Sequence, residues 1–168
     1  MVVLIGLGSN RGASERIVRE AMVRLGTFSD GALRCSGLWR TSPVDCPPDA
    51  ADFINAAVAF EARSGLSPEA LLAGLKTLER EYGERDPAIR NAPRELDLDL
   101  LLFGEERRSS ADFCLPHPRA VQRRFVLAPA AEVSPDTVWP GTGATIRALL
   151  AGLRTDERVE RLETDESG

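Results

Sequence analysis

Two aspartates, Asp97 and Asp99, stand two residues apart in a leucine-rich segment and could together bind a metal ion. The run LDLDLLLF (residues 96–103) is typical of a buried strand, in which successive side chains point to opposite faces. One face should carry Leu96, Leu98, Leu100 and Leu102, and the other Asp97, Asp99, Leu101 and Phe103. Two neighbouring buried carboxylates are costly unless a cation neutralises them. Oxygen ligands at this spacing suit Mg²⁺, particularly when substrate phosphates complete its coordination shell.

Two other interpretations of this pair remain open on spacing alone. The aspartates could be solvated on an exposed face, although that face turns apolar at Leu101. A DxD motif also occurs in nucleotide-sugar transferases and phosphatases. The motif by itself therefore indicates a metal site without identifying the reaction.

Basic side chains flank the aspartate pair on both sides. They are Arg85, Arg90 and Arg94 upstream, and His117, Arg119, Arg123 and Arg124 downstream. Arginine offers a planar fork of donors that matches phosphate oxygens, and phosphoryl transfer depends mainly on positioning and charge neutralisation. The combination predicts a site for a polyphosphate. Because neither a P-loop nor a G-x-G-x-x-G motif is present, ATP would bind without either.

Asn55 is the one amide in the otherwise apolar run FINAAVAF (residues 53–60). In a strand, Ile54, Ala56, Val58 and Phe60 would share one face, and Phe53 and Asn55 the other. A buried amide without partners costs about 1 to 3 kcal/mol. Asn55 therefore has either a structural partner or a flat ligand with donor and acceptor edges, stacked on Phe53.

Composition restricts the class of protein. The 168 residues carry a net charge of −5, with 43% hydrophobic and 28% charged residues, as in an ordinary globular domain. The acidic balance argues against general nucleic-acid binding, and no long apolar run predicts a membrane segment or signal peptide. Cys35, Cys46 and Cys114 suggest small fillers in a reducing compartment rather than disulfides or a zinc site. We expect a cytoplasmic, monomeric enzyme with small-molecule substrates.

The order of elements predicts the fold class. Residues 2–7 form a strand that stops in a glycine turn at residues 6–10, and Ser14 caps a helix that Gly26 ends. Further elements are expected as strands over 33–40, 53–60 and 96–103 and helices starting at Ser67 and over 146–153. This order is an α+β, ferredoxin-like βαββαβ core with a C-terminal extension, its antiparallel sheet packed by helices. One domain over residues 1–160 and a frayed tail over 161–168 are expected.

Five segments, in order and over most of the chain, resemble one enzyme family. They are LGSN (7–10), WRTSP (39–43), FINAAV (53–58), NAPRELDLDLLLFG (91–104) and LPHPR with RRFVL (115–127). The chain is similar to the 6-hydroxymethyl-7,8-dihydropterin pyrophosphokinases of folate biosynthesis. The resemblance implies transfer of diphosphate from ATP to the hydroxymethyl group of a reduced pterin, with release of AMP, on a ferredoxin-like fold.

The same resemblance implies roles for individual residues. Asp97 and Asp99 would hold two Mg²⁺ ions, and Asp97 would also face the pterin hydroxyl. The pterin would be bound by Thr41, Ser42, Pro43, Val44, Phe53, Asn55, Asp97 and Phe125. The ATP side would be formed by Glu79, Arg90, Arg94, His117 and Arg123, and the catalytic set by Asp97, Asp99, Arg94, Arg85 and His117.

One departure from the family concerns the segment before the aspartates. Members usually carry Arg directly after the glycine that ends the second helix, but here Gly83 is followed by Glu84 and then Arg85. We expect Arg85 to replace the missing Arg as a lid residue. Two other classes of function stay open: a DxD-type nucleotide-dependent transferase, and a non-catalytic ferredoxin-like binding module.

Overall fold

One antiparallel sheet organises the computed structural model of the chain, which describes residues 1–41, 52–83 and 95–162. Its strands are β1 (Val2–Ser9), β2 (Arg34–Cys35), β3 (Trp39–Thr41), β4 (Phe53–Glu61), β5 (Asp97–Phe103) and β8 (Val159–Arg161). Neighbouring strands follow the order β5-β1-β4-β3-β8. Strand β2 also pairs with β4, at other residues of β4 than β3 does. Strands β6 (Arg108–Ser109) and β7 (Cys114–Leu115) form a separate pair.

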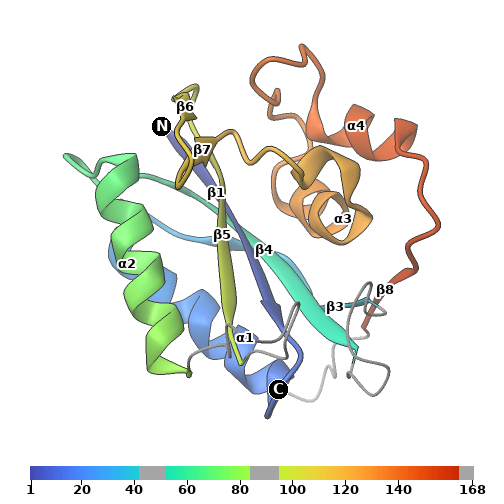
Figure 1. Cartoon of the computed structure of the whole chain (residues 1–168), viewed down its shortest axis with the longest axis horizontal. Coiled ribbons are helices and arrows are strands. Elements are labelled where there is room, and N and C mark those ends of the chain that lie inside the picture. Colours follow the sequence, from blue (N-terminus) through green and yellow to red (C-terminus); the bar gives the residue numbers. More distant parts are fainter. Residues whose placement is uncertain (42–51, 84–94, 163–168) are drawn as a thin grey trace.

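Helices cover both faces of this sheet (Figure 1). The helices are α1 (Ser14–Arg24) and α2 (Pro68–Glu81) on one face, and α3 (Arg124–Val133) and α4 (Ile146–Gly152) on the other. Short 3-10 turns occupy Leu25–Phe28 and Ala120–Gln122. When β2 and β3 are counted as one interrupted strand, the elements of the core follow the order β1-α1-β3-β4-α2-β5. This order confirms the predicted ferredoxin-like core.

The two faces of the sheet bury separate cores. Alternate residues of β1 and β4, such as Ile5 and Val58, pack with Val18 of α1 and Leu75 of α2, and all four are fully buried. On the other face Leu4 and Ala59 belong to a second core that includes Leu127, Trp139 and Ile146. The face predicted for residues 53–60, with Ile54, Ala56, Val58 and Phe60, is therefore confirmed as part of the first core.

The predicted alternation along β5 holds at its start and is wrong at its end. Leu98 pairs with Leu7 and Leu100 with Ile5, but Leu102 pairs with Leu4, so Leu101 is an extra residue opposite β1. Such a bulge moves all following side chains to the other face. Leu102 consequently joins the α3 side, and Phe103 joins the α1 and α2 side.

Element ends differ from the sequence prediction where capping decided them. Ser67 accepts a hydrogen bond from the Ala70 N–H at 3.1 Å and caps α2 as expected. Ser14, by contrast, is the first residue of α1 and not its cap; its hydroxyl accepts from the Ser9 hydroxyl at 3.0 Å. Helix α1 stops at Arg24 because a 3-10 turn follows it, before the expected end at Gly26.

Beyond Arg154 the charged segment contains an element that the sequence did not indicate. Strand β8 pairs with β3, with Trp39 opposite Arg161 and Thr41 opposite Val159. It spans the boundary at 160–161 that was predicted between the domain and its tail, so Arg161 belongs to the sheet. Residues 163–168 lie outside the described residues.

The expected role of the cysteines as small fillers is wrong for Cys35, which is exposed. This thiol lies in β2, both of whose residues are exposed, whereas Cys114 is partly buried. Cys46 lies outside the described residues.

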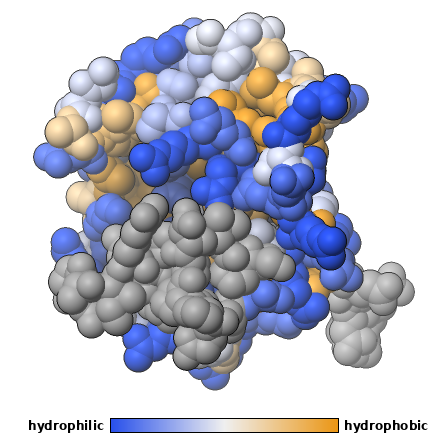
Figure 2. Space-filling model, turned by 45° about the vertical axis from the view of Figure 1, so that its right-hand side comes forward, coloured by the Kyte–Doolittle hydropathy of each residue, from blue (hydrophilic) through white to orange (hydrophobic). Residues whose placement is uncertain are grey.

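On the face drawn in Figure 2, hydrophilic side chains are interspersed with apolar ones. Within the described ranges, no helix is long and apolar enough to cross a membrane.

Candidate active site

Asp97 and Asn55 lie in one row across three neighbouring strands. Gly8 of β1 is paired with Asp97 of β5 on one side and with Asn55 of β4 on the other. Since paired strands are spaced about 4.8 Å apart, the backbones of Asp97 and Asn55 are roughly 10 Å apart. Sheet register therefore brings a carboxylate and an amide, 42 residues apart in sequence, to the two ends of one short surface.

On this face of the sheet, β1 carries glycines instead of larger residues. Gly6 is paired with Asp99, and a Cβ on Gly6 would be 3.5 Å from Leu101 Cδ1, an ordinary contact. A Cβ on Gly8 would be only 3.1 Å from Asn55 Nδ2 and 4.0 Å from Phe53 Cδ1. The sequence had predicted a turn over residues 6–10, but β1 continues to Ser9. Gly8 therefore marks a close approach within a strand.

Asn55 is held in one orientation by Thr41. The Thr41 hydroxyl donates to Asn55 Oδ1 at 2.8 Å, and both residues are buried. This hydrogen bond fixes the amide so that Nδ2 is directed at Gly8, which is where the close approach occurs. Thr41 is thus a structural partner of Asn55, one of the two alternatives that the sequence left open. Thr41 also orients the Asn55 amide toward Gly8.

Asp97 and Asp99 lie on the same face of β5, both partly exposed. They project on the side away from α1 and α2, since Leu98 and Leu100 between and beside them belong to the core on that side. In the described part of the chain, no group of three or more His, Cys, Asp or Glu side chains is arranged to hold a metal. Two carboxylates beside side-chain-free glycines fit Mg²⁺, which commonly takes one or two carboxylates and completes its shell with water and phosphate.

Glu79 of α2 reaches the edge of the sheet beside Asp97. Its Oε2 accepts the Leu98 N–H at 2.8 Å, and Lys76 Nζ lies 3.3 Å from its Oε1. Burial raises the pKa of Glu79; the Leu98 N–H and Lys76 oppose this, while the negative charge of Asp97 adds to it. Glu79 consequently lies close enough to Asp97 for the two carboxylates to interact electrostatically.

His117 approaches the same aspartate from the segment after β7. Its backbone N–H donates to the Leu101 carbonyl at 2.9 Å, and its Nδ1 accepts the Arg119 N–H at 3.3 Å. Burial lowers the pKa of His117, although the charge of Asp97 acts in the opposite direction. The neutral ring would then carry its proton on Nε2, so that this nitrogen can donate to a phosphate oxygen.

Arg123 and Phe125 form a second group at the start of α3. The Arg123 guanidinium lies 4.5 Å from the centre of the Phe125 ring, and its Nε donates to Glu157 Oε2 at 2.8 Å. Glu157 is a residue that the sequence did not single out. No local pattern links it to residue 123.

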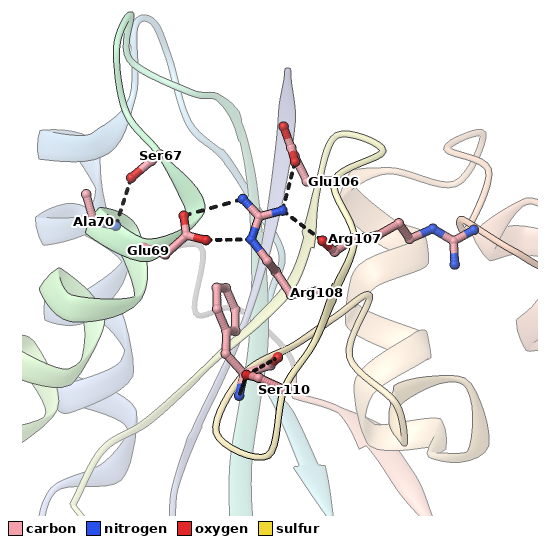
Figure 3. A network of polar contacts seen from close by, with 8 residues as sticks. Ser67, Glu69, Ala70, Glu106, Arg107, Arg108 and Ser110 are labelled. Atoms are coloured by element: carbon pink, nitrogen blue, oxygen red, sulfur yellow. Dashed lines mark hydrogen bonds and ion pairs between the residues drawn. The ribbon is translucent and has the colours of Figure 1, made fainter.

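The β6–β7 hairpin, which leads into His117, is tied to α2 (Figure 3). Arg108 forms ion pairs with Glu69 of α2 and with Glu106, and also donates to the Arg107 carbonyl at 2.8 Å. Hydrogen bonds to these carboxylates raise the pKa of Arg108 above its usual range. Such partly exposed pairs contribute little stability each, but together they position the hairpin against the helix.

Six of the predicted site residues lie outside the described residues. They are Ser42, Pro43, Val44, Arg85, Arg90 and Arg94, so the expected replacement of the usual lid Arg by Arg85 falls there too. The structure joins Thr41, Phe53, Asn55, Glu79, Asp97 and His117 around one row and places Arg123 with Phe125.

Several curated proteins are similar in sequence to this chain. Curated relatives named 2-amino-4-hydroxy-6-hydroxymethyldihydropteridine pyrophosphokinase include one from Bacillus subtilis, 34% identical over 99% of this chain and 93% of its own length. The relative from Pseudomonas aeruginosa with the same name is 35% identical over 95% of this chain and 96% of its own. A mitochondrial folate synthesis bifunctional protein of Arabidopsis thaliana is 42% identical over 78% of this chain, which spans only 23% of that protein.

Solved structures share the fold at low sequence identity. A crystal structure of Plasmodium falciparum HPPK-DHPS matches 89% of this chain and 44% of its own with a TM-score of 0.67 at 12% identity. The family profile described as 7,8-dihydro-6-hydroxymethylpterin-pyrophosphokinase (HPPK) matches residues 4–135. Because this match covers most of the chain and includes most of β1 and all of β4, β5 and His117, the chain belongs to the HPPK family.

Proposed function

We propose that this chain transfers the terminal diphosphate of ATP to the hydroxymethyl group of 6-hydroxymethyl-7,8-dihydropterin, releasing AMP, in folate biosynthesis. Family membership supports the reaction class. The observation that carries the assignment to this site is the row in which Gly8 separates Asp97 from Asn55. It offers an amide for a flat heterocycle at one end and carboxylates for a metal-bound polyphosphate at the other.

Asn55 would read the edge of the pterin, because Thr41 already holds its amide in one orientation. Phe53, beside Gly8, and Phe125, under Arg123, supply aromatic rings for the two faces of the heterocycle. The Thr41–Asn55 hydrogen bond exists without the ligand, so ordering the amide on ligand binding costs little free energy.

Asp97 and Asp99 would hold two Mg²⁺ ions. When bound, these ions would neutralise the charge of the ATP phosphates. His117 Nε2 and the Arg123 guanidinium would donate to phosphate oxygens, and Asp97 would face the pterin hydroxyl. The hydroxyl oxygen then bonds to the β-phosphorus of ATP while the bond between that phosphorus and the α–β bridging oxygen breaks. AMP leaves with the bridging oxygen, and the hydroxyl proton passes to water.

Product analysis and calorimetry test this proposal together. With ATP, the reduced pterin and Mg²⁺, we expect AMP and pterin diphosphate in equal amounts. Titration of a non-hydrolysable ATP analogue, followed by pterin, should show nucleotide binding that requires Mg²⁺. A binding module would form no AMP, and a nucleotide-sugar transferase would use a nucleotide sugar instead.

Asp97→Asn and Asp99→Asn should each abolish turnover while the fold survives, because the carboxylates serve the metal ions. Without metal, the unfolding free energy should stay level or rise, since one of two neighbouring negative charges is removed. Asp136→Asn is the matched control, because Asp136 is exposed and paired with Arg147 at 3.0 Å. Normal turnover in either variant at β5 would refute the metal assignment. The monomeric state stays a prediction.

A further inference from the structure

Glu157 is a nearly buried carboxylate that lies between α4 and β8 and contacts the start of α3. Its side chain is 8% exposed. Oε2 accepts from Arg123 Nε at 2.8 Å, and Oε1 accepts from the Arg124 backbone N–H at 2.8 Å and from the Thr155 hydroxyl at 3.5 Å. A carboxylate this far from water is retained only when charged or polar donors surround it, as they do here.

Arg124 also connects the start of α3 to the segment that contains Glu157. Its guanidinium donates to the carbonyls of Glu157 at 3.0 Å, Thr155 at 3.4 Å and Leu153 at 3.5 Å. The segment 153–157 is thereby fixed to the first residues of α3 through both a side chain and the backbone. Phe125 follows directly in α3, so the position of its ring depends on the same contacts.

The geometry of Arg123 shows what Glu157 does for it. Glu157 accepts the hydrogen bond from Nε, and Cζ of the guanidinium lies 4.5 Å from the centre of the Phe125 ring. A guanidinium has four further N–H donors, on Nη1 and Nη2, in a fixed fork that matches phosphate. The hydrogen bond from Nε to Glu157 limits the rotation of the long Arg123 side chain and so fixes the direction of these four donors.

We infer that Glu157 is a positioning residue, which orients Arg123 toward the phosphates of ATP and at the same time fixes Phe125 for the pterin. The inference rests on the proposed function, in which these two residues serve different substrates. A single carboxylate from the C-terminal segment would then determine the geometry of both binding groups. Glu157 itself touches neither substrate.

A double-mutant cycle tests whether Glu157 acts through Arg123. Glu157→Gln keeps the size of the side chain but presents an amide to Arg123 Nε, so we expect kcat/KM for ATP to fall at least about tenfold. Affinity for a non-hydrolysable ATP analogue, measured by calorimetry, should fall as well. In the Arg123→Ala background, Glu157→Gln should change either quantity less than about twofold, because its target is already absent.

Glu132→Gln is the matched control, since Glu132 is a carboxylate near the other end of α3. It accepts the Gly37 N–H at 2.6 Å and Arg161 Nε at 3.0 Å, and so also ties α3 to the C-terminal part of the sheet. Glu132→Gln should lower the unfolding free energy without lowering the affinity for the ATP analogue. Should Glu157→Gln fail to fold, Glu157→Asp retains the charge, and we expect it to show a smaller loss of affinity of the same kind.

Parental kinetics and affinity in Glu157→Gln, or in Glu157→Asp if only that variant folds, would overturn the inference. Equal losses with and without Arg123 would also overturn it, because they would show a purely structural role. If the parental protein forms no AMP from ATP and pterin, the proposed function fails instead, which is a separate result.

Discussion

Gly8→Ala should weaken pterin binding without weakening the sheet. Gly8 does not adopt a positive φ, and alanine in a strand interior is ordinarily more stable than glycine by about 0.5 to 1 kcal/mol. The new Cβ would lie 3.1 Å from Asn55 Nδ2, closer than ordinary van der Waals contact, so the amide has to move. Since Thr41 holds Oδ1 at 2.8 Å, the displacement falls on Nδ2, which would bind the pterin edge.

The expected loss follows from the hydrogen bonds that the amide would no longer make well. Misaligned or unsatisfied hydrogen bonds in a buried site cost about 1 to 3 kcal/mol, which corresponds to a roughly 5- to 150-fold weaker pterin affinity. Calorimetric titration of pterin into the complex with Mg²⁺ and the ATP analogue measures this change. Urea unfolding should show that the Gly8→Ala fold is as stable as the parental one.

Gly6→Ala separates this contact from any general effect of alanine in β1. Gly6 lies two residues earlier on the same face, and its Cβ would make an ordinary 3.5 Å contact with Leu101 Cδ1. We expect its pterin affinity to stay within about twofold, or about 0.4 kcal/mol, of the parental value. Parental pterin binding by Gly8→Ala, or the same loss in Gly6→Ala, would refute the reasoning.

Four further predictions concern the Asn55 amide, the Thr41 hydroxyl that orients it, the single histidine and a helix cap. Asn55→Ala should weaken pterin binding by about 1 to 3 kcal/mol and leave the ATP analogue unaffected in calorimetry, whereas equal losses for both ligands would indicate a structural role. Thr41→Val removes only the hydroxyl that orients this amide, so the loss of pterin affinity should be smaller, about 1 kcal/mol. His117 is the single histidine, and NMR titration of the metal-free protein should give a pKa below 6.5, because burial disfavours its charged form. The unfolded state then binds more protons, so the unfolding free energy should fall as the pH drops below 6.5, and His117→Gln should reduce this loss. Ser67→Ala should lower the unfolding free energy in urea by about 1 kcal/mol through loss of the hydrogen bond from Ala70, with unchanged affinity for the ATP analogue.

The sequence by itself determined those features that depend on local periodicity and on residue type. Alternation in β4 and in the first half of β5 correctly placed Asn55, Asp97 and Asp99 on the faces opposite the α1 and α2 core. The Ser67-Pro68 start of α2 was equally evident, because a cap is a contact within one turn. The order of these elements was sufficient to predict the ferredoxin-like sheet.

Only the tertiary structure decided how these pieces meet. Register brings Gly8 between Asp97 and Asn55, and the bulge at Leu101 reverses the faces of Leu102 and Phe103; neither is encoded within a single strand. The pair of Arg123 with Glu157 joins residues 34 positions apart, and the second of them lies in a segment without a recognisable pattern. Contacts of this kind arise from packing between distant elements, because the free energy that fixes them appears only once the sheet and its helices have assembled.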